Sequence, residues 1–269
     1  MTAANGFERV EGNSWTLGFG NLFARENRKW WASRRWWVQA VIWLVILVGL
    51  VGLVLFVVPT LTAPDGSAVS QEDPIMSALQ GFFGLGGMAL AIGITILMQD
   101  ELVAEKQAGT AEWVLSKPVS RAAFFLAKLV AHTTGMLLVM LALPSLGAYA
   151  LLTVYSGAPY PLAPFLAGVA LLAMHTFFYL ALTLMLGVLV ERREVILAVA
   201  MVSLLGGSLI RNFLPTLSLI TPWFLPDVGG LVAMGAELPA QFLLPIVATP
   251  IWSLVFIIVA LRFFRRYEF

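Results

Sequence analysis

The sequence predicts an all-α membrane protein with six transmembrane helices, and three observations support this prediction. The chain has 269 residues, of which 60% are hydrophobic and only 12% are charged, whereas soluble domains have about 25% charged residues. Several apolar runs reach about 20 residues, the length that a helix needs to cross a bilayer. Lysine and arginine gather in alternate connections between these runs. A soluble core of this size could not bury so much apolar surface, so lipid is the expected solvent.

The N-terminal residues 1–37 are polar and basic, and we expect them to form an amphipathic helix at the membrane interface. Phe23, Trp30 and Trp37 recur every seven residues, and Arg25 and Arg28 lie near the opposite side of the same helix. Tryptophan prefers the headgroup level, and arginine suits anionic lipid. The segment is either a plain anchor or an elbow helix that transmits motion. No cleaved signal peptide is expected, because the first apolar run begins far from Met1.

Six apolar segments are predicted to form one transmembrane domain over residues 38–261. The predicted spans are residues 38–58, 78–98, 122–154, 163–190, 195–210 and 242–261, and a tail follows at residues 262–269. Proline ends the first span at Pro59, and the second span is rich in glycine. The fifth span is the weakest prediction, because it is short and the residues after it stay apolar.

The distribution of basic residues predicts a protein of the cell (inner or cytoplasmic) membrane with both termini in the cytoplasm. With six spans, 15 of the 16 lysine and arginine residues fall on one side, and only Arg211 falls on the other. Asp65, Glu72 and Asp73 follow the first span without a basic residue beside them. Basic residues stay cytoplasmic, and a count of five or seven spans would break the pattern.

A compact charged segment separates the second and third spans. Its sequence, DELVAEKQAGTAEWVLSKPVSRAAFFLAK, covers residues 100–128 and holds eight of the 31 charged residues. Gly109 is expected to break the helix that continues from the second span. Thr110 would cap a short new helix by accepting a backbone N–H with its hydroxyl. Lys117 and Pro118 would end this helix, because proline disfavours helix for the residue before it.

The third span is expected to begin at Ser120, which would cap it. Val119 and Phe124 have the spacing of a hydrophobic staple around that cap. The short helix before it would expose Trp113 and Leu115 to the cytosol, and apolar side chains exposed among charges usually mark a surface for a partner. The alternative interpretation is an ordinary well-capped loop.

This segment resembles the region between the second and third spans of ABC-2 type permeases, the membrane subunits of one class of ABC transporter. The pattern there is an acidic-basic pair, Gly-Thr, an acidic-apolar helix, a Pro-x-Ser-Arg turn and a lysine in the next helix. The corresponding residues here are Glu105-Lys106, Gly109-Thr110, Glu112-Trp113-Val114-Leu115-Ser116, Pro118-Val119-Ser120-Arg121 and Lys128. Many members have an acidic residue two positions before the glycine, where this chain has Gln107.

The resemblance implies a permease subunit, with export as the expected direction, whose short helix couples to an ATPase subunit. The coupling residues that it implies are Glu105, Gly109, Thr110, Glu112, Trp113, Leu115, Ser116, Pro118, Ser120 and Arg121. It also implies two ATPase chains and two membrane subunits, so that this chain pairs with itself or with a paralogue. The chain has no G-x-x-x-x-G-K-[ST] phosphate loop. ATP and Mg²⁺ are therefore expected in the partner ATPase, and no cofactor in this chain.

The stretch between the fifth and sixth spans is predicted to lie outside or to re-enter the membrane. Prolines and a glycine pair make one continuous helix unfavourable there, and backbone at membrane depth must pack in protein or line a cavity. Short re-entrant helices would shield the outer mouth of a pathway, and a simple extracellular loop is the alternative. The residues singled out are Pro215, Pro222, Pro226, Asp227, Gly229 and Gly230.

Other functions fit the residues less well. His132 and His175 lie inside spans with no carboxylate near them in sequence, so each is expected to bond a backbone carbonyl rather than a metal. No catalytic residue is predicted, and an intramembrane hydrolase would require motifs that the chain lacks. A membrane anchor or scaffold without transport remains an alternative. A net charge of +1 gives no reason to expect nucleic acid. An apolar pathway would suit lipid, drug and peptide exporters alike.

Overall fold

The described part of the chain is helical. The computed structural model describes residues 15–61 and 73–266, and these ranges contain no β-strand. The predictions for Asp65, Glu72, the first 14 residues and the last three residues of the tail concern parts outside the described residues. The protein is therefore an all-α membrane protein by its helix content and by the length and apolar character of its helices.

Within residues 15–61 and 73–266, five helical stretches are long and apolar enough to cross a membrane. They are Arg35–Thr60, Pro74–Gln107, Arg121–Ser156, Leu162–Leu189 and Ala240–Arg265. Each overlaps one of the predicted spans, and the second extends past the predicted end at residue 98 as far as Gln107. The predicted span 195–210 lies within α11 (Arg193–Phe213), a continuous helix of 21 residues that is not among the five. The crossing of the membrane by α11 therefore stays a prediction.

The first three stretches consist of shorter helices placed end to end. The first contains α2 (Arg35–Trp43), η1 (Leu44–Val48), α3 (Gly49–Gly52), η2 (Leu53–Val57) and η3 (Val58–Thr60). The second contains α4 (Pro74–Gln80), η4 (Gly81–Leu85), α5 (Gly86–Met98) and, after a turn, α6 (Val103–Gln107). The third contains α8 (Arg121–Met136), η5 (Leu137–Ala142) and α9 (Leu143–Ser156). The other two are α10 (Leu162–Leu189) and α14 (Leu243–Arg266), which follows η7 (Ala240–Phe242).

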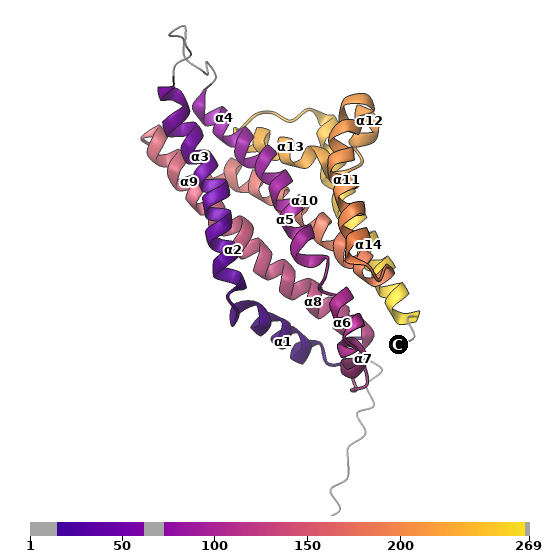
Figure 1. The fold of residues 1–269 in the computed structure, drawn as a ribbon. Helices are drawn as coiled ribbons and strands as arrows, with labels where there is room; N and C mark the ends of the chain where they lie inside the picture. The colour runs from indigo at the N-terminus through magenta and orange to yellow at the C-terminus, as the bar shows by residue number, and fades with distance from the viewer. Residues whose placement is uncertain (1–14, 62–72, 267–269) are drawn as a thin grey trace, which may run out of the picture.

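The helices run between two ends of the molecule (Figure 1). One end carries α1 (Phe19–Trp31), α6, α7 (Thr110–Leu115) and the end of α14. Here we call it the basic end, because the basic residues of the described helices gather there with the exception of Arg211, which lies near the C-terminus of α11. The opposite end carries α4, α12 (Pro215–Ser218) and α13 (Leu225–Ala233). Because basic residues mark the cytoplasmic side in membrane proteins, the cytoplasmic location of the basic end stays a prediction.

Helix α10 forms the centre of the fold. In the most apolar segment of α10, 61% is buried, against 22% in that of the first stretch and 17% in that of the last. The first and last stretches therefore face the surroundings, whereas α10 is enclosed. Helix α13 lies directly on α10, where a Cβ at Gly168 would stand 2.4 Å from the Gly229 carbonyl oxygen. Glycine at 168 thus allows the two backbones to touch.

The prediction of one amphipathic helix reaching Trp37 is wrong. Helix α1 ends at Trp31, and α2 begins at Arg35 in a different direction, so Trp37 does not share a helix with Phe23. Trp30 is only 2% exposed and packs on α8, where a Cβ at Gly135 would meet its ring at 2.5 Å. It is therefore a core residue of the α1–α8 contact rather than a side chain of the membrane interface. Arg25 and Arg28 are exposed, as expected.

Candidate functional site

The short helix α7 presents one large apolar side chain to solvent. Trp113 is 63% exposed, whereas Ala111 and Val114 on the other side of the helix are buried. The Lys117 ammonium lies 4.8 Å above the Trp113 ring, and the Ser116 hydroxyl donates to the Trp113 carbonyl at 2.8 Å. Leu115 was expected to be exposed as well, but it is partly buried against the core. The exposed side of α7 therefore presents Trp113, with the charged Glu112 beside it.

The start of α7 is set by glycine rather than by a hydroxyl cap. Gly109 has a φ of 67°, which is the left-handed region that favours glycine, and it occupies the N-cap position. Thr110 is the first residue of the helix, and no side chain caps the helix, so the predicted cap by Thr110 is wrong. The turn at Gly109 lets the chain change direction between α6 and α7, which lie next to each other (Figure 1).

The turn after α7 is attached to the start of α1. The Ser120 hydroxyl accepts the Ala123 N–H at 2.9 Å, so the predicted cap of the third span is confirmed. The same hydroxyl donates to the Trp15 carbonyl, and the Ser120 N–H donates to the Leu17 carbonyl at 3.0 Å. These bonds join the residues before α1 to the turn between α7 and α8. Pro118, in the same turn, is exposed at the surface.

Side chains near α7 also hold the ends of two other long helices. Lys106 donates to the carbonyls of Val188 and Val190 at 3.2 and 3.1 Å, at the C-terminus of α10. Gln107, at the position that is acidic in many ABC-2 permeases, donates to the Glu191 carbonyl at 3.1 Å. Arg121 donates to the Arg265 carbonyl at 2.7 Å near the end of α14. The helices around α7 are therefore connected to α1, α10 and α14.

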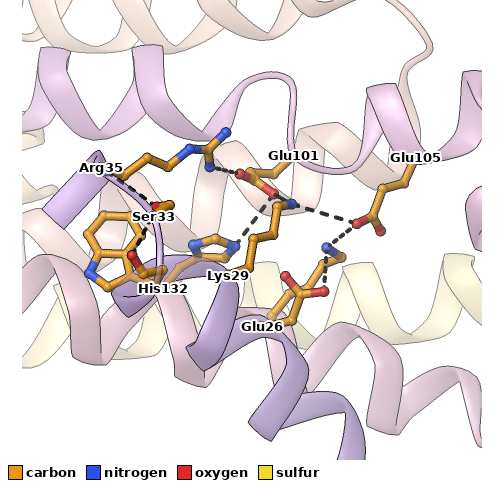
Figure 2. A network of polar contacts seen from close by, with 9 residues as sticks. Glu26, Lys29, Ser33, Arg35, Glu101, Glu105 and His132 are labelled. Carbon is orange, nitrogen blue, oxygen red and sulfur yellow. Dashed lines mark hydrogen bonds and ion pairs between the residues drawn. The ribbon is translucent and has the colours of Figure 1, made fainter.

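A network of charged side chains lies where α1 meets α8 and the turn between α5 and α6 (Figure 2). We call it the charged cluster, and it consists of Glu26, Lys29, Arg35, Glu101, Glu105, Lys128 and His132.

The charged cluster consists of two groups of ion pairs, one around Glu101 and the other around Lys128. Glu101 accepts from Lys29 at 2.9 Å and from Arg35 at 2.6 Å. Lys128 lies 2.8 Å from Glu105 and 3.2 Å from Glu26. A longer contact of 3.9 Å between Lys29 and Glu105 connects the halves. Glu105 and Lys128, which belong to the segment that resembles ABC-2 permeases, are thus direct partners.

The charges of this cluster balance, and its Lys128–Glu26 pair is buried, whereas the Lys29 and Arg35 side chains are 42% and 48% exposed. Three carboxylates face two lysines and one arginine, and the Lys128 side chain is only 1% exposed beside Glu26 at 4%. Burial alone would lower the pKa of Lys29, but the attraction of Glu101, helped by Glu26 and Glu105, outweighs burial and raises that pKa. A buried pair with one partner removed leaves an uncompensated charge, which is costly. The cluster therefore holds α1, α6 and α8 in one arrangement.

His132 lies at the edge of the charged cluster. Its Nε2 is 3.7 Å from the Glu101 carboxylate, and its ring meets Trp30 edge-on at 6.1 Å between centroids. Neither ring nitrogen has a hydrogen-bond partner among the described residues, so the expected bond to a backbone carbonyl is not found. This carboxylate comes from the turn between α5 and α6, so the sequence around His132 could not reveal it.

The cluster contains the donor types of a metal site, but its charges disfavour one. Donor atoms of Glu26, Glu101 and His132 lie within 4.8 Å of one another. The ammonium groups of Lys29 and Lys128 already contact the two carboxylates. A divalent cation would add two positive charges to a buried group that is already balanced, at a large electrostatic cost.

The residues singled out near the fifth and sixth spans form short helices at the opposite end. Pro215 begins α12, Pro222 begins η6 (Pro222–Phe224), and Pro226 lies in the first turn of α13. Gly229 and Gly230 are buried, and both pack against the Phe83 side chain. This stretch is thus helical and packed rather than an open loop, and Asp227 on α13 is exposed.

No known protein-family model matches the chain, and a search of curated proteins also gives no match. The geometry of α7 and of the charged cluster is therefore the basis for a functional interpretation.

Proposed function

We propose that the chain is the transmembrane permease subunit of an ABC-2 type ABC transporter that works as an exporter. The observation that carries this proposal is the exposure of Trp113 on a short helix whose surroundings are tied to α1, α10 and α14. An exposed tryptophan flanked by charges is suited to a protein partner, because tryptophan is enriched among residues that dominate binding energy. The resemblance of residues 105–128 to the coupling region of these permeases names that partner as an ATPase subunit.

The mechanism follows from the connections around α7. Closure of two ATPase subunits on ATP would push α7 through Trp113, with Glu112 available for a charged contact. Because Lys128 binds both Glu105 and Glu26, a shift of α6 would be passed to α8 and α1. The bonds of Lys106 and Arg121 would carry it to α10 and α14. ATP and Mg²⁺ belong to the partner chains, and a second membrane subunit, a copy or a paralogue, completes the pathway.

Replacement of Trp113 by alanine tests this function. We expect Trp113→Ala to weaken association with the ATPase by about 30-fold, since truncating a central tryptophan costs roughly 2 kcal/mol. The variant should still fold and insert, because the side chain is largely exposed. The measurement is the amount of ATPase that co-purifies and its ATP turnover.

The matched control is Phe213→Ala, an 80% exposed aromatic residue on α11. It should leave both quantities unchanged. Equal ATPase association and turnover for the two variants would contradict the proposal. Association without any turnover in the unmodified complex would favour a membrane anchor instead.

A further inference from the structure

An open hollow of about 680 Å³ lies on the outer side of α1, at the basic end of the molecule. Its walls come from α1 and the two residues after it, and they are Asn21, Ala24, Arg25, Arg28, Lys29, Ala32 and Ser33. Most of these residues recur every three or four positions, so they form one stripe along the helix. The buried residues of α1, which are Leu22, Glu26 and Trp30, lie on its other side. The hollow therefore faces the surroundings of the protein.

The hollow is positively charged. Its described walls contain three basic residues and no acidic one. The Lys29 ammonium already donates to Glu101 at 2.9 Å, whereas Arg25 and Arg28 are exposed and have no ion pair or hydrogen bond within the described residues. The carboxylates of the charged cluster do not offset these two arginines, because the cluster's own cations already balance them. The field at the hollow therefore attracts anions.

Exposed tryptophans lie next to the hollow, where α1 gives way to α2. Trp31 is the last residue of α1 and Trp36 lies in the first turn of α2, with 6.2 Å between their ring centroids. Both are exposed, and so is Trp37. Exposed apolar side chains continue from there, among them Val41 on α2 and Val45 on η1. Tryptophan prefers the level of the lipid headgroups, where one side is polar and the other apolar.

We propose that the hollow on α1 binds the phosphate group of an anionic phospholipid through Arg25 and Arg28, with the acyl chains along the exposed side of α2. A guanidinium presents paired N–H donors that match phosphate oxygens. The order of basic hollow, tryptophans and apolar helix follows the order of phosphate, interface and acyl chain in one lipid molecule. A soluble phosphate compound would use the arginines but not the tryptophans or α2. This inference does not depend on the proposed function.

The test compares two lipids that have the same acyl chains and different headgroup charges. Scintillation proximity with the purified full chain in a neutral detergent would measure binding of radiolabelled dioleoyl phosphatidylglycerol and dioleoyl phosphatidylcholine. We expect the anionic lipid to bind at least fivefold more tightly. Arg25→Gln combined with Arg28→Gln should remove this preference, because each basic residue at a lipid surface contributes about fivefold to binding.

The matched control is Arg192→Gln combined with Arg193→Gln, which removes the same charge from exposed arginines at the start of α11. It should keep the preference for phosphatidylglycerol. Ala24→Glu is a further variant that leaves both arginines in place. The new carboxylate would lie one turn before Arg28 and should weaken binding of phosphatidylglycerol, because it would pair with that guanidinium.

Inorganic phosphate distinguishes a lipid from a soluble ligand. In excess it should displace phosphatidylglycerol no more than sodium chloride of the same ionic strength does, and stronger displacement would assign the hollow to soluble phosphate and overturn the inference. Equal binding of both lipids to the unmodified chain would also overturn it. So would a preference that neither Arg25→Gln with Arg28→Gln nor Ala24→Glu reduces, or one that the control variant loses as well.

Discussion

Lys128 is the residue on which the charged cluster depends most. Its side chain is enclosed, and it contacts the carboxylates of Glu26 and Glu105 on two other helices. The sequence marks Lys128 through the resemblance to ABC-2 permeases, which indicates that a lysine belongs in this helix. It does not indicate Glu26, because that residue lies in an N-terminal helix whose inner side is apolar apart from it.

Removal of the Lys128 charge should destabilise the protein. Lys128→Met leaves two buried carboxylates without their shared cation, and breaking a buried pair in this way costs about 3–5 kcal/mol. We expect a clearly lower midpoint in thermal unfolding of the detergent-solubilised protein. Lys117→Met, at an exposed lysine, should unfold close to the unmodified chain. A midpoint unchanged by Lys128→Met would contradict this role of the cluster.

At the scale of the element, the N-terminal helix shows what the sequence could and could not predict. The amphipathic character and the exposed arginines were predictable from spacing. The break after Trp31 was not, since residues 32–34 contain neither glycine nor proline. Ser33 is the one local signal, because its hydroxyl donates to the Trp30 carbonyl at 3.0 Å and accepts the Arg35 N–H at 3.3 Å. The direction of α1 is set by tertiary contacts of Trp30 and Glu26 with α8.

The attachment of α1 to the turn after α7 gives a prediction for this element. Gly18 has a φ of 80°, and a Cβ there would lie 2.5 Å from Val119 Cγ1. Gly18→Ala should therefore displace the start of α1, and the left-handed backbone alone costs about 1–2 kcal/mol for a residue with a Cβ. The measurement is the rate of limited proteolysis within α1, together with the unfolding midpoint.

Gly20 offers a matched control for that experiment. It lies on α1, and a Cβ there would meet nothing within 4 Å. Gly20→Ala should keep or raise the stability of α1, because alanine favours helix by about 1 kcal/mol over glycine. The same proteolysis rate for both variants would show that α1 is not anchored at Val119.

For the whole molecule, the all-helical architecture and the long apolar helices could be read from the length and composition of the apolar runs. The packing between them could not. The position of α13 on α10 depends on the close approach of Gly168 and Gly229, which are far apart in sequence. This placement also brings the Asp227 carboxylate of α13 close to Gly84 of η4. The sequence could not show that His175 of α10 would lie against the Pro222 carbonyl, because the two residues are far apart in the chain.

Cross-linking from position 113 tests whether α7 is the contact between this chain and an ATPase. The chain has no cysteine, so Trp113→Cys provides a single thiol for a short photoactivatable cross-linker in intact cells, and Phe213→Cys serves as the control. We expect that position 113, and not position 213, becomes joined to a chain that carries a G-x-x-x-x-G-K-[ST] loop and hydrolyses ATP. A folded, inserted Trp113→Cys protein that yields no such product, or the same product from both positions, would contradict it.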